Sequence, residues 1–225
     1  MAEGFDIANL TLRLEQPDET RENENVTREA FWNVYVPGCD EHYLLHIMRD
    51  SPAFVPELNF VAVYEGRIIG NAVCAKSVIR SDDGNEYTML GLGPISVLPA
   101  YQSKGVGGRF IAHAKQKARN MGCRAILLYG DPAYYARHGF VAAESFDIRT
   151  SDDMYAEALQ VCELCENALS GITGCYCEDQ VYEIDETAAA AFDRTFPPKK
   201  KEEGLASQRR FLALVASRKE RSPLK

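Results

Sequence analysis

The chain has 225 residues, of which 46% are hydrophobic and 26% charged, and its formal net charge is -8. This length allows one large domain or a domain with an appendage, and the negative charge argues against broad nucleic-acid binding and suits a cationic partner such as an amine. The sequence shows no apolar run of the roughly 20 residues that span a membrane and no signal-peptide pattern at its N-terminus. Its seven cysteines do not form a secreted disulfide framework. A cytoplasmic protein with no membrane partner is therefore expected.

One strand and two helices are predicted at the start of the chain. Leu10–Leu14 alternates as a strand does. Arg21–Val36 carries apolar side chains at helical spacing and is followed by Pro37-Gly38, which predicts the end of that helix. Glu41–Arg49 predicts a second helix.

The next segments predict antiparallel strands. Phe60–Tyr64 and Ile68–Ile79 are joined at Glu65-Gly66-Arg67, which is typical of a hairpin. Tyr87–Val97 is expected to pair back on them. Pro94 lies inside this third strand and cannot donate to the ladder, so it predicts a bulge or an edge there.

The segment from Leu90 to Gly108 predicts a buried strand, a turn and a glycine-rich entry into a helix over about Gly105–Met121. Small residues allow backbone N–H groups to reach a ligand. The first turn of a helix has unpaired N–H groups and the positive end of the dipole, which bind phosphate. The segment therefore indicates a phosphate-bearing cofactor.

Three glycine motifs could explain this turn. A P-loop requires a lysine followed by Ser or Thr, which is missing, and a dinucleotide fingerprint belongs to a first strand–helix unit, whereas this turn lies in the middle of the chain. The third pattern, Q-x-x-G-x-G, is matched by Gln102, Gly105 and Gly107. A tight connection without any ligand is the simpler alternative.

A second strand–turn–helix unit follows. The apolar run Ala125–Tyr129 predicts a buried strand. Asp131 is placed to cap a short helix that begins at Pro132, and Gly139 is placed to end it. Hairpins followed by such a crossover unit predict an α/β sheet of mixed direction.

The run GLGPISVLPAYQSKGVG followed by GDPAYYARHGF resembles the GNAT superfamily of acyl-CoA-dependent N-acetyltransferases, and within it the YhbS-like bacterial branch. The resemblance is best from about Phe60 to Val141. It implies a mixed, mostly antiparallel central sheet of about six to seven strands flanked by helices, a core over residues 1–150, and a C-terminal extension over 151–225. The extension is expected to pack on the core or on another subunit, and it could build a homodimer.

The resemblance also implies where coenzyme A binds. In this family the glycine turn holds the pyrophosphate, and the strand before it splays from the next strand, which leaves a gap for the pantetheine arm. Lys104 and Arg109 flank the glycines and could supply positive charge, or could be ordinary solvated side chains. The expected cofactor-binding residues are Ile95, Val97, Gln102, Ser103, Lys104, Gly105, Val106, Gly107, Gly108, Arg109, Asp131 and Tyr134.

The implied reaction moves an acetyl group from acetyl-CoA to a primary amine of a small molecule or peptide by direct attack, without a metal. The N–H of Val97 would stabilise the oxyanion, and Tyr135 would be the catalytic residue that protonates the departing thiolate. Either Tyr134 or Tyr135 could instead be a core aromatic. Water or one of four residues could be the base, namely Glu86, Asp131, His113 and Glu144.

Two other functions remain open at this point. A non-catalytic acyl-CoA-binding sensor or regulatory module would use the same turn without turnover. A nucleotide-binding protein would bind ATP or NAD there. The acceptor cannot be predicted, because specificity in this fold resides in segments where the resemblance is weak.

Two metal-site patterns are weak. His42 and His46 lie four residues apart without the glutamate of H-E-x-x-H. Cys162, Cys165, Cys175 and Cys177 depart from the common zinc spacing and are expected to be small buried residues.

The last third of the chain has weaker patterns. Met154–Leu164 fits a helix or a strand, and the resemblance favours a strand. Val181–Ile184 is a short strand candidate. Asp185 is placed to cap a helix over Glu186–Thr195, and Gln208–Arg218 predicts a last helix.

Overall fold

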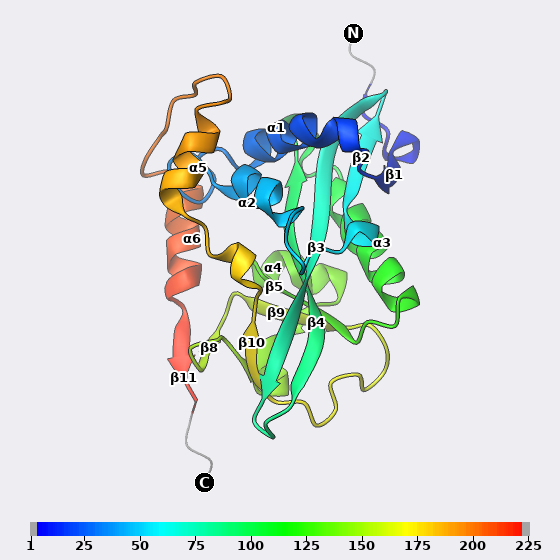
Figure 1. Cartoon of the computed structure of the whole chain (residues 1–225), viewed down its shortest axis with the longest axis vertical. Helices are drawn as coiled ribbons and strands as arrows, with labels where there is room; N and C mark the ends of the chain where they lie inside the picture. The colour runs from blue at the N-terminus through cyan, green and yellow to red at the C-terminus, as the bar shows by residue number, and fades with distance from the viewer. Residues whose placement is uncertain (1–3, 222–225) are drawn as a thin grey trace.

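A nine-stranded sheet forms the centre of the computed structural model, which describes residues 4–221 (Figure 1). Its strand order is β1-β2-β3-β4-β5-β9-β6, with β10 beside β3 and β7 beside β10, and β11 pairs with β8 in a separate sheet of two. Within the described part of the chain, β4–β5 and β7–β10 are parallel pairs and the other pairs are antiparallel. The predicted mixed, mostly antiparallel fold is confirmed, with more strands than the six to seven expected.

The strands are β1 Thr11–Leu14, β2 Phe60–Tyr64, β3 Arg67–Ser81, β4 Glu86–Val97, β5 Ala125–Tyr129, β6 Val141–Ala142, β7 Ile148–Arg149, β8 Met154–Ala156, β9 Leu159–Glu163, β10 Gly174–Cys177 and β11 Arg218–Glu220.

Helices cover both faces of the sheet (Figure 1). The helices are α1 Thr20–Phe31, α2 Glu41–Met48, α3 Val106–Asn120, α4 Pro132–Tyr135, α5 Glu186–Asp193 and α6 Ala206–Ala216. α1 and α2 pack on one face and α3 packs on the other. No helix over residues 4–221 is long and apolar enough to cross a membrane.

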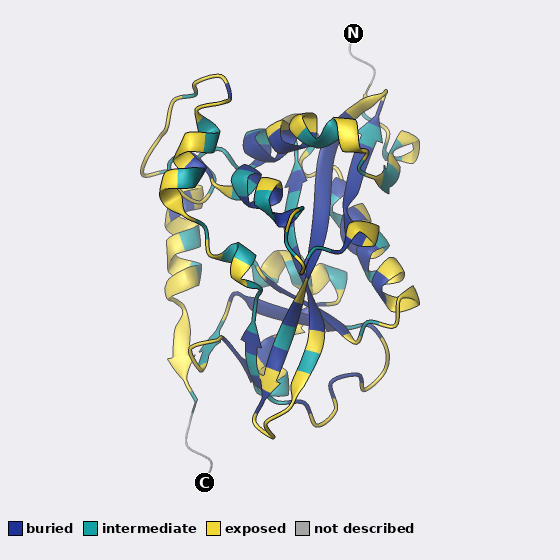
Figure 2. Cartoon of the chain, in the orientation of Figure 1, coloured by how far each residue is buried: buried dark blue, intermediate teal, exposed yellow. Residues whose placement is uncertain are grey.

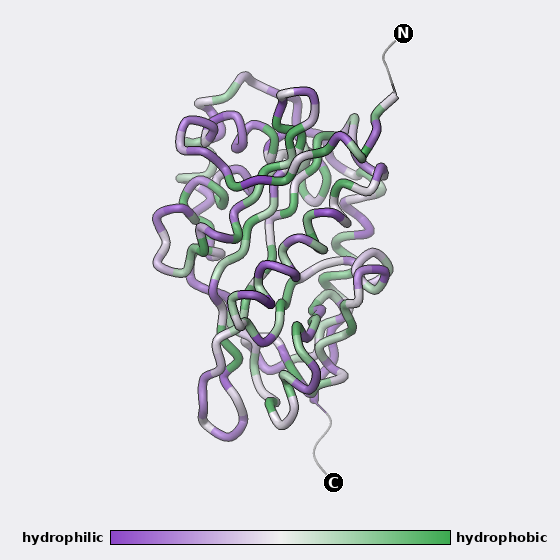
Figure 3. The backbone as a smooth tube through the Cα atoms, turned by 90° about the vertical axis from the view of Figure 1, so that its right-hand side faces the viewer, coloured by the Kyte–Doolittle hydropathy of each residue, from purple (hydrophilic) through white to green (hydrophobic). Residues whose placement is uncertain are grey.

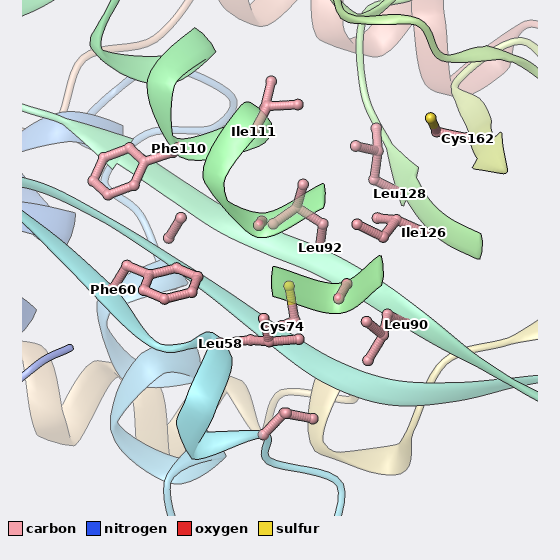
Figure 4. Close-up of a cluster of buried hydrophobic side chains, with 14 of the residues drawn as sticks. Leu58, Phe60, Cys74, Leu90, Leu92, Phe110, Ile111, Ile126, Leu128 and Cys162 are labelled. Atoms are coloured by element: carbon pink, nitrogen blue, oxygen red, sulfur yellow. The ribbon is translucent and has the colours of Figure 1, made fainter. Parts of the chain in front are cut away.

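The two-residue period of β3 explains why both faces are covered. Ala72 and Cys74 point to the core under α3, whereas Val73 and Ala75 pack under α2. Figure 4 shows the core on the α3 side, where side chains from β2, β3, β4 and β5 meet Phe110 and Ile111. Figure 2 shows the sheet buried and α6 and β11 largely exposed. In Figure 3, short hydrophobic and hydrophilic stretches alternate along the helices, as expected for helices that bury one side.

Most predicted elements before residue 150 are confirmed, but the first helix is shorter than predicted. It ends at Phe31 instead of Val36. Asn33 adopts a left-handed φ of 62° and donates its N–H to the Gly38 carbonyl, and its side chain accepts from the Gly38 N–H, each at 2.8 Å. This asparagine turn replaces the last helical hydrogen bonds.

The C-terminal third contains one wrong prediction and several confirmed ones. Met154–Leu164 holds two strands, β8 and β9, separated by a turn, so the favoured strand is confirmed with an interruption. The Val181–Ile184 strand is wrong: Gln180–Tyr182 is a 3-10 turn (η7) capped by the Asp179 side chain. α5 with its Asp185 cap is confirmed, and so is a last helix, although α6 runs over Ala206–Ala216 and Arg218 belongs to β11.

A buried polar cluster joins α1 to the middle of the sheet. The Asn71 side chain on β3 donates to Asn23 Oδ1 at 2.6 Å and to Thr27 Oγ1 at 2.7 Å, both on α1. Ser96 on β4 donates to Thr27 Oγ1 at 3.2 Å. All four residues are buried, so these hydrogen bonds satisfy polar groups that water does not reach.

We predict that Asn71→Ala lowers the free energy of unfolding by about 2–3 kcal/mol, because Asn23 and Thr27 lose a buried donor. Urea denaturation followed by circular dichroism measures this change. Asn85→Ala, in an exposed turn, is the control and should change stability by less than about 0.5 kcal/mol. Equal urea midpoints for both variants would contradict the role given to this cluster.

Candidate active site

The site is built around a gap between β4 and β5. These strands pair in parallel at Leu90–Ile126 and Gly91–Leu127 and then separate, although β4 continues to Val97 and β5 to Tyr129. On its other side β4 stays paired with β3, with a register shift opposite Gly93 and Pro94. Pro94 therefore marks a bulge, as predicted, and the β4 edge beyond Gly91 faces the gap without a strand partner.

The glycine turn connects the end of β4 to α3. Gln102 Nε2 donates to the Val97 carbonyl at 2.9 Å, which fixes the turn on the end of the strand. Ser103 and Gly105 adopt left-handed φ values of 59° and 88°, and Gly105 is the N-cap of α3. No described side chain caps this helix, so its first N–H groups are free to bind an anion.

Two glycines at the start of α3 allow a close approach by the segment after β5. A Cβ on Gly107 would lie 2.5 Å from Tyr134 Oη, and one on Gly108 would lie 2.8 Å from His138 Cε1. Val106, between the turn and these glycines, is buried in the core. The absence of a side chain at Gly107 thus allows the Tyr134 hydroxyl to lie next to the start of α3.

Tyr135 lies at the gap itself. Its ring packs so closely on Gly130 that any Cβ there would overlap the ring, and it contacts Phe140 edge-on with centroids 5.6 Å apart. Its hydroxyl has no hydrogen-bond partner among residues 4–221. Burial, with smaller effects from Tyr35 and Tyr134, raises the pKa of Tyr135, so the hydroxyl remains a proton donor at neutral pH.

The remaining predicted cofactor residues surround the same turn. Ile95 and Val97 are half-buried against the core on the α3 side. Lys104 and Arg109 are exposed cations at the turn and at the start of α3. Asp131 accepts the Ala133 N–H at 2.9 Å, which caps α4 as predicted.

Asp131 also forms an ion pair that the sequence analysis did not identify. Its carboxylate accepts from Arg210 of α6, and the Phe211 ring next to it stacks on Tyr35 at 4.7 Å between centroids. The C-terminal helix therefore lies against the rim of the gap. No local pattern could have shown this, because Asp131 and Arg210 are 79 positions apart in the chain.

The four candidate bases are dispersed. Glu86 is exposed at the opposite end of β4 from Val97 and pairs with Arg80 at 3.0 Å. The His113 ring packs edge-on against Phe60, and Glu144 pairs with Lys219 at 2.6 Å. Asp131 is thus the candidate that lies next to Tyr135 at the end of β5.

Two cavities adjoin the end of β5. The larger, of about 570 Å³, lies between α6, Tyr35 and the β5 end, and its wall is mainly apolar. The second, of about 420 Å³, lies beside η7 and the end of β10. Tyr129 and Ser151 line both cavities, so the two are neighbours.

The weak metal patterns have structural explanations. His42 is buried with its Nε2 3.3 Å from Asp193, and His46 Nδ1 lies 2.8 Å from Glu24. The seven cysteines are free. Cys162 is buried as expected, but Cys165 is exposed and Cys175 and Cys177 are half-buried, so the expected burial is wrong for these three. Residues 4–221 contain no group of three or more potential metal ligands.

The chain matches proteins of one family. A model of the acetyltransferase (GNAT) family matches residues 22–140. The uncharacterized N-acetyltransferase YhbS of Escherichia coli K12 is 29% identical over 166 residues, which are 73% of this chain and 93% of YhbS. The uncharacterized N-acetyltransferase YjhQ of the same strain is 35% identical over 85 residues, which are 38% of this chain and 46% of YjhQ.

Solved structures agree in fold. YhbS from Escherichia coli in complex with CoA superposes with a TM-score of 0.70 and 24% identity, covering 81% of this chain and 97% of that one. A GNAT family acetyltransferase from Brucella melitensis in complex with acetyl-CoA gives a TM-score of 0.63 and 27% identity, covering 77% and 97%. Because the family model spans residues 22–140 and these folds agree, the chain belongs to the GNAT family of acetyltransferases.

Proposed function

We propose that the protein transfers an acetyl group from acetyl-CoA to a primary amine of a small molecule or peptide, by direct attack in a ternary complex. The observation that carries this proposal is the position of the glycine turn. It lies directly at the gap between β4 and β5, with the unpartnered hydroxyl of Tyr135 alongside. The Brucella melitensis relative, at 27% identity, was solved with acetyl-CoA.

The residues at the turn fit an anionic, amide-containing ligand. The first N–H groups of α3 and the cations Lys104 and Arg109 would hold the pyrophosphate. The free edge of β4 near Ile95 and Val97 would pair with the pantetheine amides, because a strand edge without a partner offers N–H and C=O groups to an extended ligand. Tyr134, over Gly107, would pack beside the bound arm.

Holding both reactants in one gap supplies much of the rate in this proposal. The N–H of Val97 would stabilise the oxyanion that develops on the thioester carbonyl. Tyr135 would give its proton to the leaving sulfur, since its raised pKa keeps it protonated at neutral pH. A non-catalytic acyl-CoA sensor is the second candidate, and turnover distinguishes the two.

The first experiment is a calorimetric titration with acetyl-CoA, with ATP and NAD as controls. We expect saturable binding of acetyl-CoA with a Kd in the micromolar range, about -8 kcal/mol, and no binding of ATP or NAD. Folded protein that binds a nucleotide control equally well, or does not bind acetyl-CoA, would rule out this cofactor.

Gly107→Glu should weaken acetyl-CoA binding at least about 100-fold, or about 2.7 kcal/mol, because its carboxylate repels the pyrophosphate at the start of α3. The new Cβ would displace the Tyr134 hydroxyl, which lies 2.5 Å from it at the end of an exposed side chain, and a glutamate in the first turn suits the helix dipole, so folding should be retained. Gln116→Glu adds the same charge at an exposed position later in α3 and should bind as the wild type does. Unchanged affinity in Gly107→Glu would remove the turn from the cofactor site.

Tyr135→Phe should lower kcat about 100-fold while the Kd for acetyl-CoA stays the same, because the ring still packs on Gly130 and one proton donor is lost. Single-turnover measurements of free thiol, with calorimetry for affinity, test this. Tyr87→Phe removes a hydroxyl at the far end of β4 and should retain wild-type kcat. A wild-type protein that binds acetyl-CoA without any turnover would support the sensor instead.

A further inference from the structure

A carboxylate among tyrosines lines the smaller cavity. Glu178 follows β10 and lines it together with Tyr129 of β5, Tyr176 of β10 and Tyr182 of η7. The cavity lies on the face of the sheet opposite α3. This follows from the alternation along β5, where Leu127 packs with Tyr176 and Leu128 packs under α3.

Two of the tyrosines that line this cavity contact β4 where the gap between β4 and β5 begins. A Cβ on Gly91 would lie 2.9 Å from Tyr176 Oη and 3.6 Å from Tyr182 Oη. The Tyr182 hydroxyl donates to the Gly93 carbonyl at 3.1 Å. Gly91 is the last β4 residue paired with β5, so the tyrosine hydroxyls stand where the gap begins.

The position of the cavity determines which reactant it can hold. The glycine turn and α3 lie on one face of the sheet, so acetyl-CoA bound there would fill the gap from that face. An amine can then reach the thioester carbonyl from the opposite face, where Glu178 and the tyrosines lie. A primary amine is an ammonium ion at neutral pH, and a carboxylate beside hydroxyl groups is suited to bind it.

The Glu178 carboxylate is available to bind an ammonium ion. Among residues 4–221 no group donates a hydrogen bond to its carboxylate, which is half-buried. Burial raises the pKa of Glu178 to about 7. A carboxylate with this pKa can accept a proton near neutral pH and release it again.

The other charged or titratable groups around the cavity are engaged elsewhere or exposed. Arg80 pairs with Glu86, and Asp179 accepts from Ser51 Oγ and the Val181 N–H. Cys177 Sγ lies 3.7 Å from the Cys175 carbonyl, and Glu183 is exposed.

Glu41 on α2 is the rival carboxylate. Burial raises its pKa to about 7 as well. Its carboxylate accepts the Asp40 N–H at 3.1 Å, however, and it does not line the cavity that Glu178 and the tyrosines share. Geometry therefore favours Glu178.

We propose that Glu178 binds the ammonium group of the acceptor and acts as the general base that removes its proton. This inference rests on the proposed acetyl transfer. Tyr129, Tyr176 and Tyr182 form the rest of the ammonium site, with Tyr182 also holding the β4 bulge through Gly93.

The proton balance is complete with these residues. Glu178 accepts one proton from the ammonium, which leaves a nitrogen lone pair. The nitrogen forms the C–N bond at the carbonyl carbon while the C–S bond breaks and its electron pair leaves on sulfur. Tyr135 protonates the sulfur, the second nitrogen proton replaces the one that Tyr135 lost, and Glu178 releases its proton to solvent.

The test measures CoA release from acetyl-CoA with tyramine, spermidine and a peptide carrying a free lysine as probes, between about pH 5.5 and 9. Wild-type kcat/KM should fall below about pH 7, because the protonated Glu178 cannot accept a proton. Glu178→Gln should lower kcat at least about 100-fold and lose the change near pH 7, its activity rising instead with the free-amine fraction toward an amine pKa of about 10, while calorimetry shows unchanged acetyl-CoA affinity. Glu166→Gln, which removes the same charge from an exposed loop, is the control and should match the wild type.

Each outcome separates the two proposals. Turnover by Glu178→Gln at the wild-type rate with the same pH dependence overturns the role of Glu178 and leaves acetyl transfer intact. The role of Glu178 is also overturned if Glu41→Gln, rather than Glu178→Gln, loses the fall in kcat/KM below about pH 7. A wild-type protein that binds acetyl-CoA but acetylates no probe contradicts acetyl transfer to amines, and the role of Glu178 with it.

Discussion

The separation of β4 from β5 is the constraint on which the rest of the structure depends. Backbone N–H and C=O groups away from water require partners, and an unpaired strand edge inside a sheet would normally close. Here the edge beyond Gly91 stays open because both faces hold β4 in place. The Asn71 cluster ties Ser96 to α1 on one face, and the core under α3 packs against Ile95 and Val97 on the other.

The open edge divides the site into two chemically different halves. On the α3 face, unpaired helix N–H groups and cations suit phosphate. On the opposite face, tyrosine hydroxyls and the Glu178 carboxylate suit an ammonium ion. A protein of net charge -8 can therefore offer an anion site locally while its other face attracts a cation. In the proposed reaction, the sheet would separate the two reactants, which would meet at the gap beside Tyr135.

Local patterns were enough to predict the elements around the glycine turn. Pro94 indicated the bulge, Asp131 indicated the α4 cap, and the glycines indicated the turn before α3, since each depends on residues close in the chain. The opposite face could not be predicted in this way. Tyr182 meets Gly93 across 89 positions, and Glu178 is placed by the pairing of β10 with β3.

Contacts between distant segments also explain the two wrong predictions, the length of the first helix and the strand at Val181–Ile184. The first helix was predicted to continue to Val36 because its apolar spacing continues, but Asn33 is held by Gly38 and by Gln208 of α6, 175 positions away. At Val181 the apolar residues pack on α2 instead of pairing as a strand, with Asp179 capping the turn. In both segments a tertiary contact outweighs the local pattern.

The way α6 lies against the rim has a consequence for how such a protein can change over evolutionary time. Arg210 contacts the half-buried Asp131 and Phe211 contacts the exposed Tyr35, so these two residues of α6 meet the rim at the surface rather than in the core. Substitutions on α6 can therefore reshape the wall of the larger cavity at little cost to folding, because surface changes of this kind usually have small effects. The gap and its glycine turn would be inherited unchanged, while the shape of the larger cavity diverges between lineages.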